Sequence, residues 1–364
     1  MYSQIEHVFV EESIHDSQEA GKILDGINKD YTIINDIHNI DRTILKSKKI
    51  LVLAEQKGRY LKKCPGTPKY KCCVYFVIEL AVGCPFDCTY CFLQEYQNYS
   101  AMIIYLNFDK LYKEFDDLLS NNPNKLFRIG TGEYSDSLFL NEFINYTQNI
   151  SSYLAKKYKN YIIEFKTKSN SIDNLINSPV YGREVVSWTI SPDCVVKDEE
   201  KLTASLEERL LSAQRCAKKG YYIGIHLDPL IMFDNCFDEY KDMIGKLYDK
   251  IPKELIIWIS IGSLRFNPRL KPIIEMRHKE SDIIYGEMGR GADGKFRYIK
   301  SIRLELYKKI VGYIKAKHKD AFIYFCMEDS EVWEKVLGKK IHSNADINKL
   351  FCNRWYELTG QKLS

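Results

Sequence analysis

Short apolar runs alternate with amphipathic stretches along most of the chain. From residue 74 onward, runs of strand length are separated by segments whose apolar residues recur at helical spacing, such as 140–158 and 202–219. Strands that alternate with helices in this way predict a parallel sheet with the helices outside it. The six predicted strands of this series are 74–80, 126–129, 161–167, 185–190, 221–227 and 255–261.

Further elements are predicted toward both ends of the chain. Residues 1–63 contain three apolar runs typical of strands and one helical segment, which indicates a small α/β unit. The last hundred residues contain a helical pattern over 302–317 and a candidate seventh strand over 322–326. We therefore expect three parts, namely an N-terminal unit over 1–63, a barrel over 64–268 and a C-terminal extension over 269–364.

Composition narrows the class of protein. The 364 residues are 45% apolar, which is enough for a full core. Eleven cysteines without a signal peptide favour a reducing compartment over a disulfide scaffold, so we expect a cytoplasmic protein. No apolar run reaches the length of a membrane span, and a net charge of +4 gives little indication of a partner.

Three closely spaced cysteines follow the first strand of the series. Cys84, Cys88 and Cys91 have the spacing Cys-X3-Cys-X2-Cys. Thiolates are soft ligands that suit iron–sulfur clusters, and three of them in one loop would leave one iron of a [4Fe–4S] cluster open to a small molecule. A zinc site or three buried thiols is the alternative, but zinc usually takes a second Cys or His pair, and none has the usual spacing here.

The cysteine loop resembles the signature of the radical S-adenosylmethionine (SAM) superfamily, which has an aromatic residue at the position of Tyr90. The resemblance implies a [4Fe–4S] cluster, SAM, an electron donor such as flavodoxin or ferredoxin, and a partial (β/α)6 TIM-type barrel. Chemistry in such barrels lies at the C-terminal ends of the strands. The second strand ends in Gly-Thr-Gly-Glu, which resembles the Gly-Gly-Glu segment of the superfamily. Gly132 would let the backbone approach SAM, and Glu133 would bind its amino group.

A closer resemblance is to spore photoproduct lyase and its wider family of DNA-photolyase-like radical SAM proteins. Segments 83–94, 128–136, 165–168 and 215–224 carry this resemblance. It implies a DNA-repair lyase whose 5′-deoxyadenosyl radical acts on a thymine-dimer lesion flipped out of DNA. By the same resemblance, the SAM pocket contains Tyr90, Phe92, Gly132, Glu133, Ser135, Lys168, Thr189 and Ser191.

The chain departs from this family at two positions. In the lyase, a cysteine returns a hydrogen atom to the product, and tyrosines that flank the last cluster cysteine relay it. Here Glu133 occupies the donor position and Phe92 replaces one tyrosine, whereas Tyr90 keeps the other. Two alternatives to lesion repair therefore stay open. One is a radical SAM reaction of another type on nucleic acid, peptide or a small molecule, and the other is a structural metal module without catalysis.

A thiol elsewhere in the chain would have to replace the missing donor. Cys326 is our candidate, because it ends the candidate seventh strand and C-terminal strand ends face the active site. Cys64, Cys72 and Cys73 are rivals, but we expect their segment to enter from the opposite end of the barrel. The alternative role for Cys326 is that of a small buried hydrophobe.

A basic segment precedes the barrel. Residues 57–71 carry six basic residues and no acidic one, and their glycines and prolines favour a loop. This loop is either a solvated linker or a phosphate-binding loop in which Tyr60 and Tyr70 stack on bases. The resemblance adds Arg297 and Tyr298, which fall in the region of a lesion-probing β-hairpin.

Overall fold

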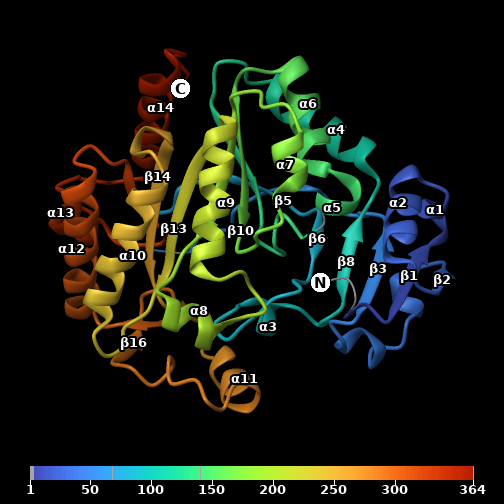
Figure 1. Ribbon diagram of the computed structural model, residues 1–364, viewed down its shortest axis with the longest axis horizontal. Helices are drawn as coiled ribbons and strands as arrows, with labels where there is room; N and C mark the ends of the chain where they lie inside the picture. The colour runs from blue at the N-terminus through green and yellow to red at the C-terminus, as the bar shows by residue number, and fades with distance from the viewer. Residues whose placement is uncertain (1–3, 68, 140, 364) are drawn as a thin grey trace.

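An eight-stranded sheet forms the centre of the computed structural model, which describes residues 4–67, 69–139 and 141–363 (Figure 1). Neighbouring strands are parallel except for the pair β4–β5 at one edge. The sheet curls into a half-barrel, so the expected partial barrel is confirmed. Its order is β18 (Ile323–Phe325), β14 (Ile256–Ser263), β13 (Tyr222–Leu230), β11 (Glu184–Thr189), β10 (Tyr161–Thr167), β9 (Phe127–Thr131), β5 (Phe76–Ile78) and β4 (Leu61–Lys63).

All six predicted strands of the series are present, and the seventh is present as β18. The first is shorter than predicted, because Val74 has a φ of +43°. This left-handed conformation is unfavourable for a β-branched residue and interrupts the extended chain before β5. Pro68 of the basic segment and Leu140, the first residue of a predicted helix, lie outside the described residues.

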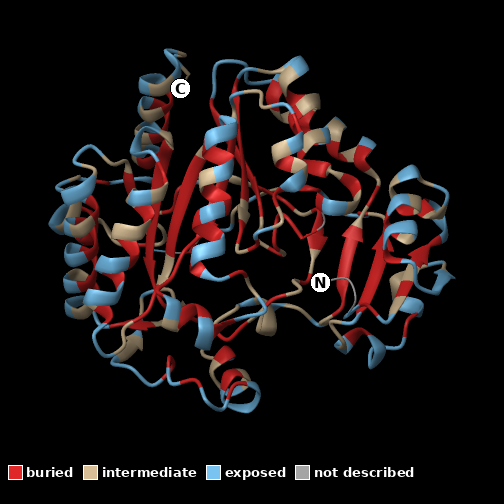
Figure 2. Ribbon diagram, viewed as in Figure 1, coloured by how far each residue is buried: buried red, intermediate tan, exposed pale blue. Residues whose placement is uncertain are grey.

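Helices cover the outer face of the half-barrel, and each buries one side and exposes the other (Figure 2). The helix α9 has clear start and stop signals. Ser205 and Glu208 form a capping box at its beginning, and Gly220 ends it with a φ of +105°. The larger covering helices are α4 (Phe108–Ser120), α6 (Tyr146–Lys157), α9 (Leu206–Lys219), α10 (Cys236–Lys250), α12 (Lys300–Lys317), α13 (Ser330–Leu337) and α14 (Asn344–Thr359).

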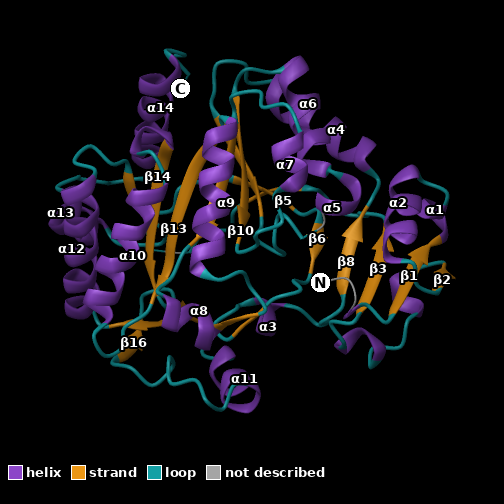
Figure 3. Cartoon of the chain, viewed as in Figure 1, coloured by secondary structure: helices purple, strands orange, loops and turns teal. Residues whose placement is uncertain are grey.

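A second, five-stranded sheet lies beside the barrel (Figure 3). The three strands predicted near the N-terminus form its first part, and β6 and β8 complete it. Because β6 and β8 flank the cysteine loop in sequence, this sheet fixes both ends of that loop. The divisions at residues 63 and 268 remain predictions. The sheet order is β2 (Tyr31–Ile34), β1 (His7–Glu11), β3 (Ile50–Ala54), β8 (Met102–Tyr105) and β6 (Ala81–Val82), and α1 (Glu12–His15) and α2 (Gln18–Ile27) connect β1 to β2.

Small elements complete the fold, and α3, α8, α11 and β16 lie together at one end of the barrel (Figure 1). None of the helices in the described part of the chain is long and apolar enough to cross a membrane. Two short antiparallel sheets are present, β7 with β12 and β15–β17–β16. The remaining elements are β7 (Asp87–Cys88), β12 (Glu200–Lys201), β15 (Arg265–Phe266), β16 (Met288–Arg290), β17 (Phe296–Tyr298), α3 (Leu93–Tyr96), α5 (Asn141–Ile144), α7 (Asp173–Asn177), α8 (Asp193–Glu199) and α11 (Leu270–Arg277).

Candidate functional site

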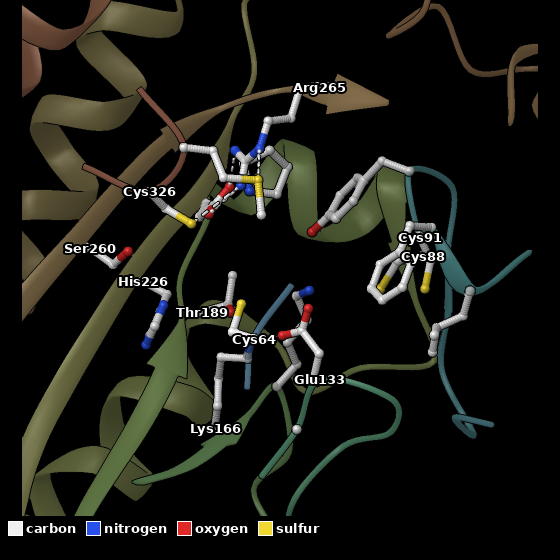
Figure 4. A pocket seen from close by; sticks show the side chains of 18 of the residues that line it. Cys64, Cys88, Cys91, Glu133, Lys166, Thr189, His226, Ser260, Arg265 and Cys326 are labelled. Carbon is white, nitrogen blue, oxygen red and sulfur yellow. Dashed lines mark hydrogen bonds and ion pairs between the residues drawn. The ribbon is translucent and has the colours of Figure 1, made fainter. Parts of the chain in front are cut away.

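A cavity of about 460 Å³ lies inside the half-barrel, and the strands, the cysteine loop and the segment before β5 all contribute to its wall. Figure 4 shows Cys88 and Cys91 on one side and Cys326, beside Arg265, on the other. All eleven cysteines of the chain are free thiols. Those that line this cavity are Cys64, Cys72, Cys73, Cys84, Cys88, Cys91 and Cys326.

Backbone pairing and one amide side chain fix the cysteine loop. The strand β7, which ends at Cys88, pairs with β12. The Cys91 amide donates to the Cys88 carbonyl at 3.2 Å. Gln94 Nε2 donates to the carbonyl oxygens of Cys88 at 3.1 Å and Thr89 at 2.8 Å. The loop conformation is therefore supported by protein contacts alone.

Two adjacent glutamates, which the sequence analysis missed, hold the loop from behind. Glu199 accepts hydrogen bonds from Thr89 and, at 2.8 Å, from Ser281. Glu200 accepts one from the Tyr90 hydroxyl. No signal in the sequence connects these residues with the loop, because Glu199 ends α8 and Glu200 begins β12, and both reach the loop where β12 pairs with β7.

Glu200 is the centre of a buried polar network. It accepts a hydrogen bond from Ser191 Oγ at 3.0 Å and forms an ion pair with Arg209 at 2.5 Å. Burial alone would raise the pKa of Glu200, but Arg209 and Lys168 outweigh burial and lower it. The carboxylate is therefore ionised and orients the Tyr90 side chain next to the last loop cysteine.

The three loop thiols fit a [4Fe–4S] cluster in their chemistry. Burial raises the pKa of Cys84, Cys88 and Cys91, that of Cys88 to about 12, so a cation has to replace their protons. Within the described ranges, no three His, Cys, Asp or Glu side chains are arranged to hold one metal ion. A [4Fe–4S] cluster places a different demand on its ligands, because each thiolate binds a different iron.

The turn after β9 provides a polar corner of the cavity. Gly132 has a φ of +91°, and a Cβ atom there would lie 2.6 Å from the Lys166 carbonyl oxygen, so glycine is required. Glu133 lines the cavity and lies 3.5 Å from Lys166 Nζ. Ser135 Oγ is buried at the cavity wall without a hydrogen-bond partner among the described residues. An orphaned hydroxyl beside a half-buried carboxylate fits a polar ligand such as SAM.

The other predicted SAM residues occupy two layers. Tyr90, Phe92, Lys168 and Thr189 line the cavity, and Lys168 Nζ lies 5.1 Å from the centre of the Tyr90 ring. Ser191 is not among the described residues that line the cavity, and its hydroxyl binds Glu200. The structure therefore brings four of these five to the cavity, whereas Ser191 supports Tyr90 through Glu200.

Cys326 lies beside a partly buried ion pair. Arg265 donates two parallel hydrogen bonds to Asp228, at 2.9 and 3.0 Å. It also donates to Cys326 Sγ at 3.6 Å. Burial raises the pKa of Cys326 well above its usual range, although Arg265 lowers it, so the thiol stays protonated at neutral pH. The predicted position of Cys326 at the cavity is correct.

Cys64, Cys72 and Cys73 were expected to lie away from the site, because their segment was predicted to enter from the opposite end of the barrel. All three line the same cavity as Cys326. The reason is that β4 runs antiparallel to β5 and the chain then folds back. It pairs Lys71 with Glu328, next to the end of β18.

A buried carboxylate inside the barrel was also missed. Glu164 of β10 lines the cavity and accepts hydrogen bonds from Ser187 Oγ at 2.5 Å and Trp258 Nε1 at 3.3 Å. His226 Nε2 lies 2.7 Å from it. Burial alone would raise the pKa of Glu164, but His226, the hydrogen bond from Ser187 and the charge of Lys166 lower it to about 2. The alternation of side chains along a strand could have indicated Glu164, because it places every second side chain of β10 inside the barrel.

Several residues of the basic segment are engaged in contacts within the protein, whereas Arg59, Lys63 and Lys69 are exposed. Residues 61–63 form the strand β4, so the prediction of a continuous loop was wrong. Lys57 pairs with Asp36, and Lys62 pairs with Glu79 at 2.7 Å. Tyr60 is 0% exposed and its hydroxyl donates to Asn107, so it cannot stack on a base in this structure.

The predicted hairpin exists as β16 and β17, but its two predicted contact residues are buried. Arg297 is 3% exposed, pairs with Asp293 at 2.7 Å and lies 4.0 Å above the Tyr70 ring. Tyr298 packs in the hydrophobic core at the barrel mouth. Arg297 and Tyr70 therefore join the basic segment to the hairpin in this structure, and a contact with nucleic acid remains a prediction.

Comparisons with known proteins agree with this geometry. A family model described as spore photoproduct lyase matches residues 42–326. The spore photoproduct lyase of Bacillus subtilis (strain 168) is 23% identical over 248 residues, which are 66% of this chain and 72% of that protein. The spore photoproduct lyase of Geobacillus sp. (strain Y412MC61) is 22% identical over 249 residues, with the same two shares.

Solved structures show the same fold. A cysteine-to-alanine mutant of spore photoproduct lyase with dinucleoside spore photoproduct has a TM-score of 0.78 at 19% identity, covering 88% of this chain and 98% of that one. A double mutant of the lyase with bound AdoMet and dinucleoside spore photoproduct has a TM-score of 0.77, with the same identity and shares.

Proposed function

The chain belongs to the spore photoproduct lyase family, and on this basis we propose that it is a radical SAM lyase that acts on a thymine-dimer lesion in DNA. One observation carries the proposal, namely that the three loop thiols share a single cavity with the polar residues at the ends of β9, β10 and β11. The similarity of fold to lyases bound to dinucleoside spore photoproduct supports this substrate class.

The residues of the cavity divide between two cofactors. Cys84, Cys88 and Cys91 would hold three irons of a [4Fe–4S] cluster, and Glu133 would accept the SAM amino group in a charge-assisted hydrogen bond. Ser135 Oγ, which lacks a partner among the described residues, is free to bind the same ligand. When both are bound, cluster and SAM supply a 5′-deoxyadenosyl radical.

The protein controls where such a radical could act. The lesion, flipped out of the duplex, would lie between the cysteine loop and the wall formed by Arg265 and Cys326. Cys326 is the proposed hydrogen donor, because its buried thiol keeps its proton and lines this cavity. An electron donor of the flavodoxin or ferredoxin class would serve the cluster, and the free thiols suit a cytoplasmic location.

Another radical SAM reaction is the second candidate. Glu133 stands where the lyase has its donor cysteine, and Phe92 has no hydroxyl with which to relay hydrogen. These two replacements favour a different product-forming step on nucleic acid, peptide or a small molecule.

Anaerobic reconstitution distinguishes these functions. The protein is incubated with dithionite, SAM and dinucleoside spore photoproduct, and 5′-deoxyadenosine and restored thymine are both measured. We expect a brown protein that cleaves SAM and restores thymine. SAM cleavage without restored thymine would favour the second candidate. Absence of both cluster and SAM cleavage would contradict a radical SAM enzyme.

A further inference from the structure

Four cysteines of the cavity are not used by the cluster, and we call them the thiol wall: Cys64, Cys72, Cys73 and Cys326. All four are free thiols, and they come from two segments that lie far apart in the sequence. A shared cavity wall gives them a chemistry that a single buried cysteine does not have, because two neighbouring thiols can form a disulfide.

Backbone pairing brings Cys73 toward Cys326. Lys71 and Glu328 form an antiparallel bridge, with the Lys71 amide donating to the Glu328 carbonyl at 2.8 Å. Cys73 is two residues after Lys71 and Cys326 is two residues before Glu328, so a regular antiparallel ladder would place them opposite each other on the same face. In a regular ladder, directly opposed residues have Cα atoms about 4.5–5.5 Å apart, within the range that disulfides span, and the single Lys71–Glu328 bridge sets the two segments side by side.

Both cysteines are held in place by neighbouring strands. The Cys73 carbonyl accepts a hydrogen bond from Arg128, whose guanidinium lies 3.4 Å from the centre of the Phe351 ring. The Cys326 amide donates to the Ile261 carbonyl of β14 at 3.0 Å. Met327 interrupts the ladder with a φ of +55°, but both thiols still line the cavity.

The other two thiols are directed to different neighbours. A Cβ atom on Gly66 would lie 3.0 Å from Cys72 Sγ, so the Cys72 thiol packs against that turn. The Cys64 side chain lies beside Glu133 at the predicted SAM-binding corner (Figure 4), and burial, followed by the Glu133 carboxylate, raises the pKa of Cys64 to about 12. Burial, Asp228, Cys73 and Cys72, in that order, raise the pKa of Cys326, and because the Cys72 thiol packs against Gly66, Cys73 is the better partner for Cys326.

We propose that Cys73 and Cys326 form a redox-active dithiol pair that is oxidised to a disulfide when Cys326 donates hydrogen to the product radical. The donation step rests on the proposed function, whereas the pairing of the two thiols does not. Cys73 would thereby quench the radical on Cys326. Phe92 cannot serve this purpose, because it has no hydroxyl group.

The S–H bond of Cys326 breaks, and a C–H bond forms on the product radical, which leaves a thiyl radical on Cys326. Cys73 loses its proton to water, and its thiolate forms an S–S bond with the thiyl radical. The resulting radical anion gives one electron to an oxidised one-electron carrier of the flavodoxin or ferredoxin class, and a dithiol later reduces the disulfide.

The pair is tested first in the absence of cluster, SAM and substrate. The reduced apoprotein is treated anaerobically with one equivalent of diamide, free thiols are alkylated, and disulfide-linked peptides are identified by mass spectrometry. We expect a Cys73–Cys326 link in the wild type and in the matched controls Cys72→Ala and Cys352→Ala. The link should be lost in Cys73→Ala. A different principal link, or no link, would overturn the pair regardless of activity.

Turnover tests the coupling. With dinucleoside spore photoproduct, SAM and flavodoxin but no dithiol, we expect about one restored product and one Cys73–Cys326 disulfide per chain, and continued turnover after dithiothreitol is added. Repeated turnover with both thiols free would overturn the coupling. If SAM is cleaved without repair while diamide still forms the link, the substrate assignment fails and the pair stands. An iron content above four per chain that Cys73→Ala lowers to four would indicate a metal site and overturn the pair.

Discussion

The two sides of the cavity differ in how the sequence encodes them. The cysteine loop takes its three thiols from residues 84–91, and β7, Gln94 and two glutamates fix its shape. The thiol wall takes its members from residues 64–73 and from the end of β18, which the Lys71–Glu328 bridge brings together. A local motif can be recognised from spacing, whereas a site that tertiary contacts assemble cannot.

Loss of a loop thiol is the most severe test of this contrast. Replacing Cys84, Cys88 or Cys91 by alanine should abolish both the visible absorption of the reconstituted cluster and SAM cleavage, because three thiolates must hold three irons. Replacing Cys216, which is buried elsewhere, should leave both unchanged. A loop variant that keeps a full cluster and activity would show that the loop is not the ligand set.

The buried network around Glu200, which supports the cysteine loop, should give the second-largest effect. Glu200→Gln leaves the buried guanidinium of Arg209 without its counter-charge, since both side chains are 0% exposed. We expect a loss of unfolding free energy on the order of 3–5 kcal/mol in urea denaturation. Glu207→Gln, on the exposed face of α9, should cost less than about 1 kcal/mol. Equal stability of Glu200→Gln and wild type would mean that the loop does not depend on this network.

The third prediction concerns Glu164 inside the barrel and is tested by measuring stability at acid pH. Glu164 has a pKa of about 2, below its usual 4.5, so its contribution to stability is complete above about pH 4.5 and is lost as the pH falls toward 2. We expect Glu164→Gln to remove on the order of 3 kcal/mol of this pH dependence, measured as unfolding free energy between pH 4.5 and 2. An unchanged slope would contradict an ionised Glu164.

SAM affinity gives the smallest of these effects. Glu133→Gln should weaken binding by about 1–3 kcal/mol, because a neutral amide replaces a charged acceptor. Calorimetric titration of the reconstituted protein measures this, with the exposed Glu142→Gln as the control. Unchanged affinity would remove Glu133 from the SAM site and return it to a role as partner of Lys166.

Periodicity and spacing predicted much of the fold and half of the site. They gave the strand series, the loop cysteines and the polar strand ends, because each depends on residues close together in the chain. They did not give β4, which the prolines and glycines around it concealed, or the burial of Tyr60. Glu199 and Glu200 were also missed, because their partners in the loop lie across a strand pair that no local pattern indicates.

Deuterium transfer tests most directly the claim that the two sides of the cavity act on one substrate. In deuterated water the cysteine thiols exchange, so thymine restored by the wild type and by the Cys72→Ala control should carry deuterium at the repaired carbon. Cys326→Ala should still cleave SAM but give no deuterium-labelled thymine, or a product trapped as a dithionite adduct. Normal turnover with unchanged labelling in Cys326→Ala would contradict the account.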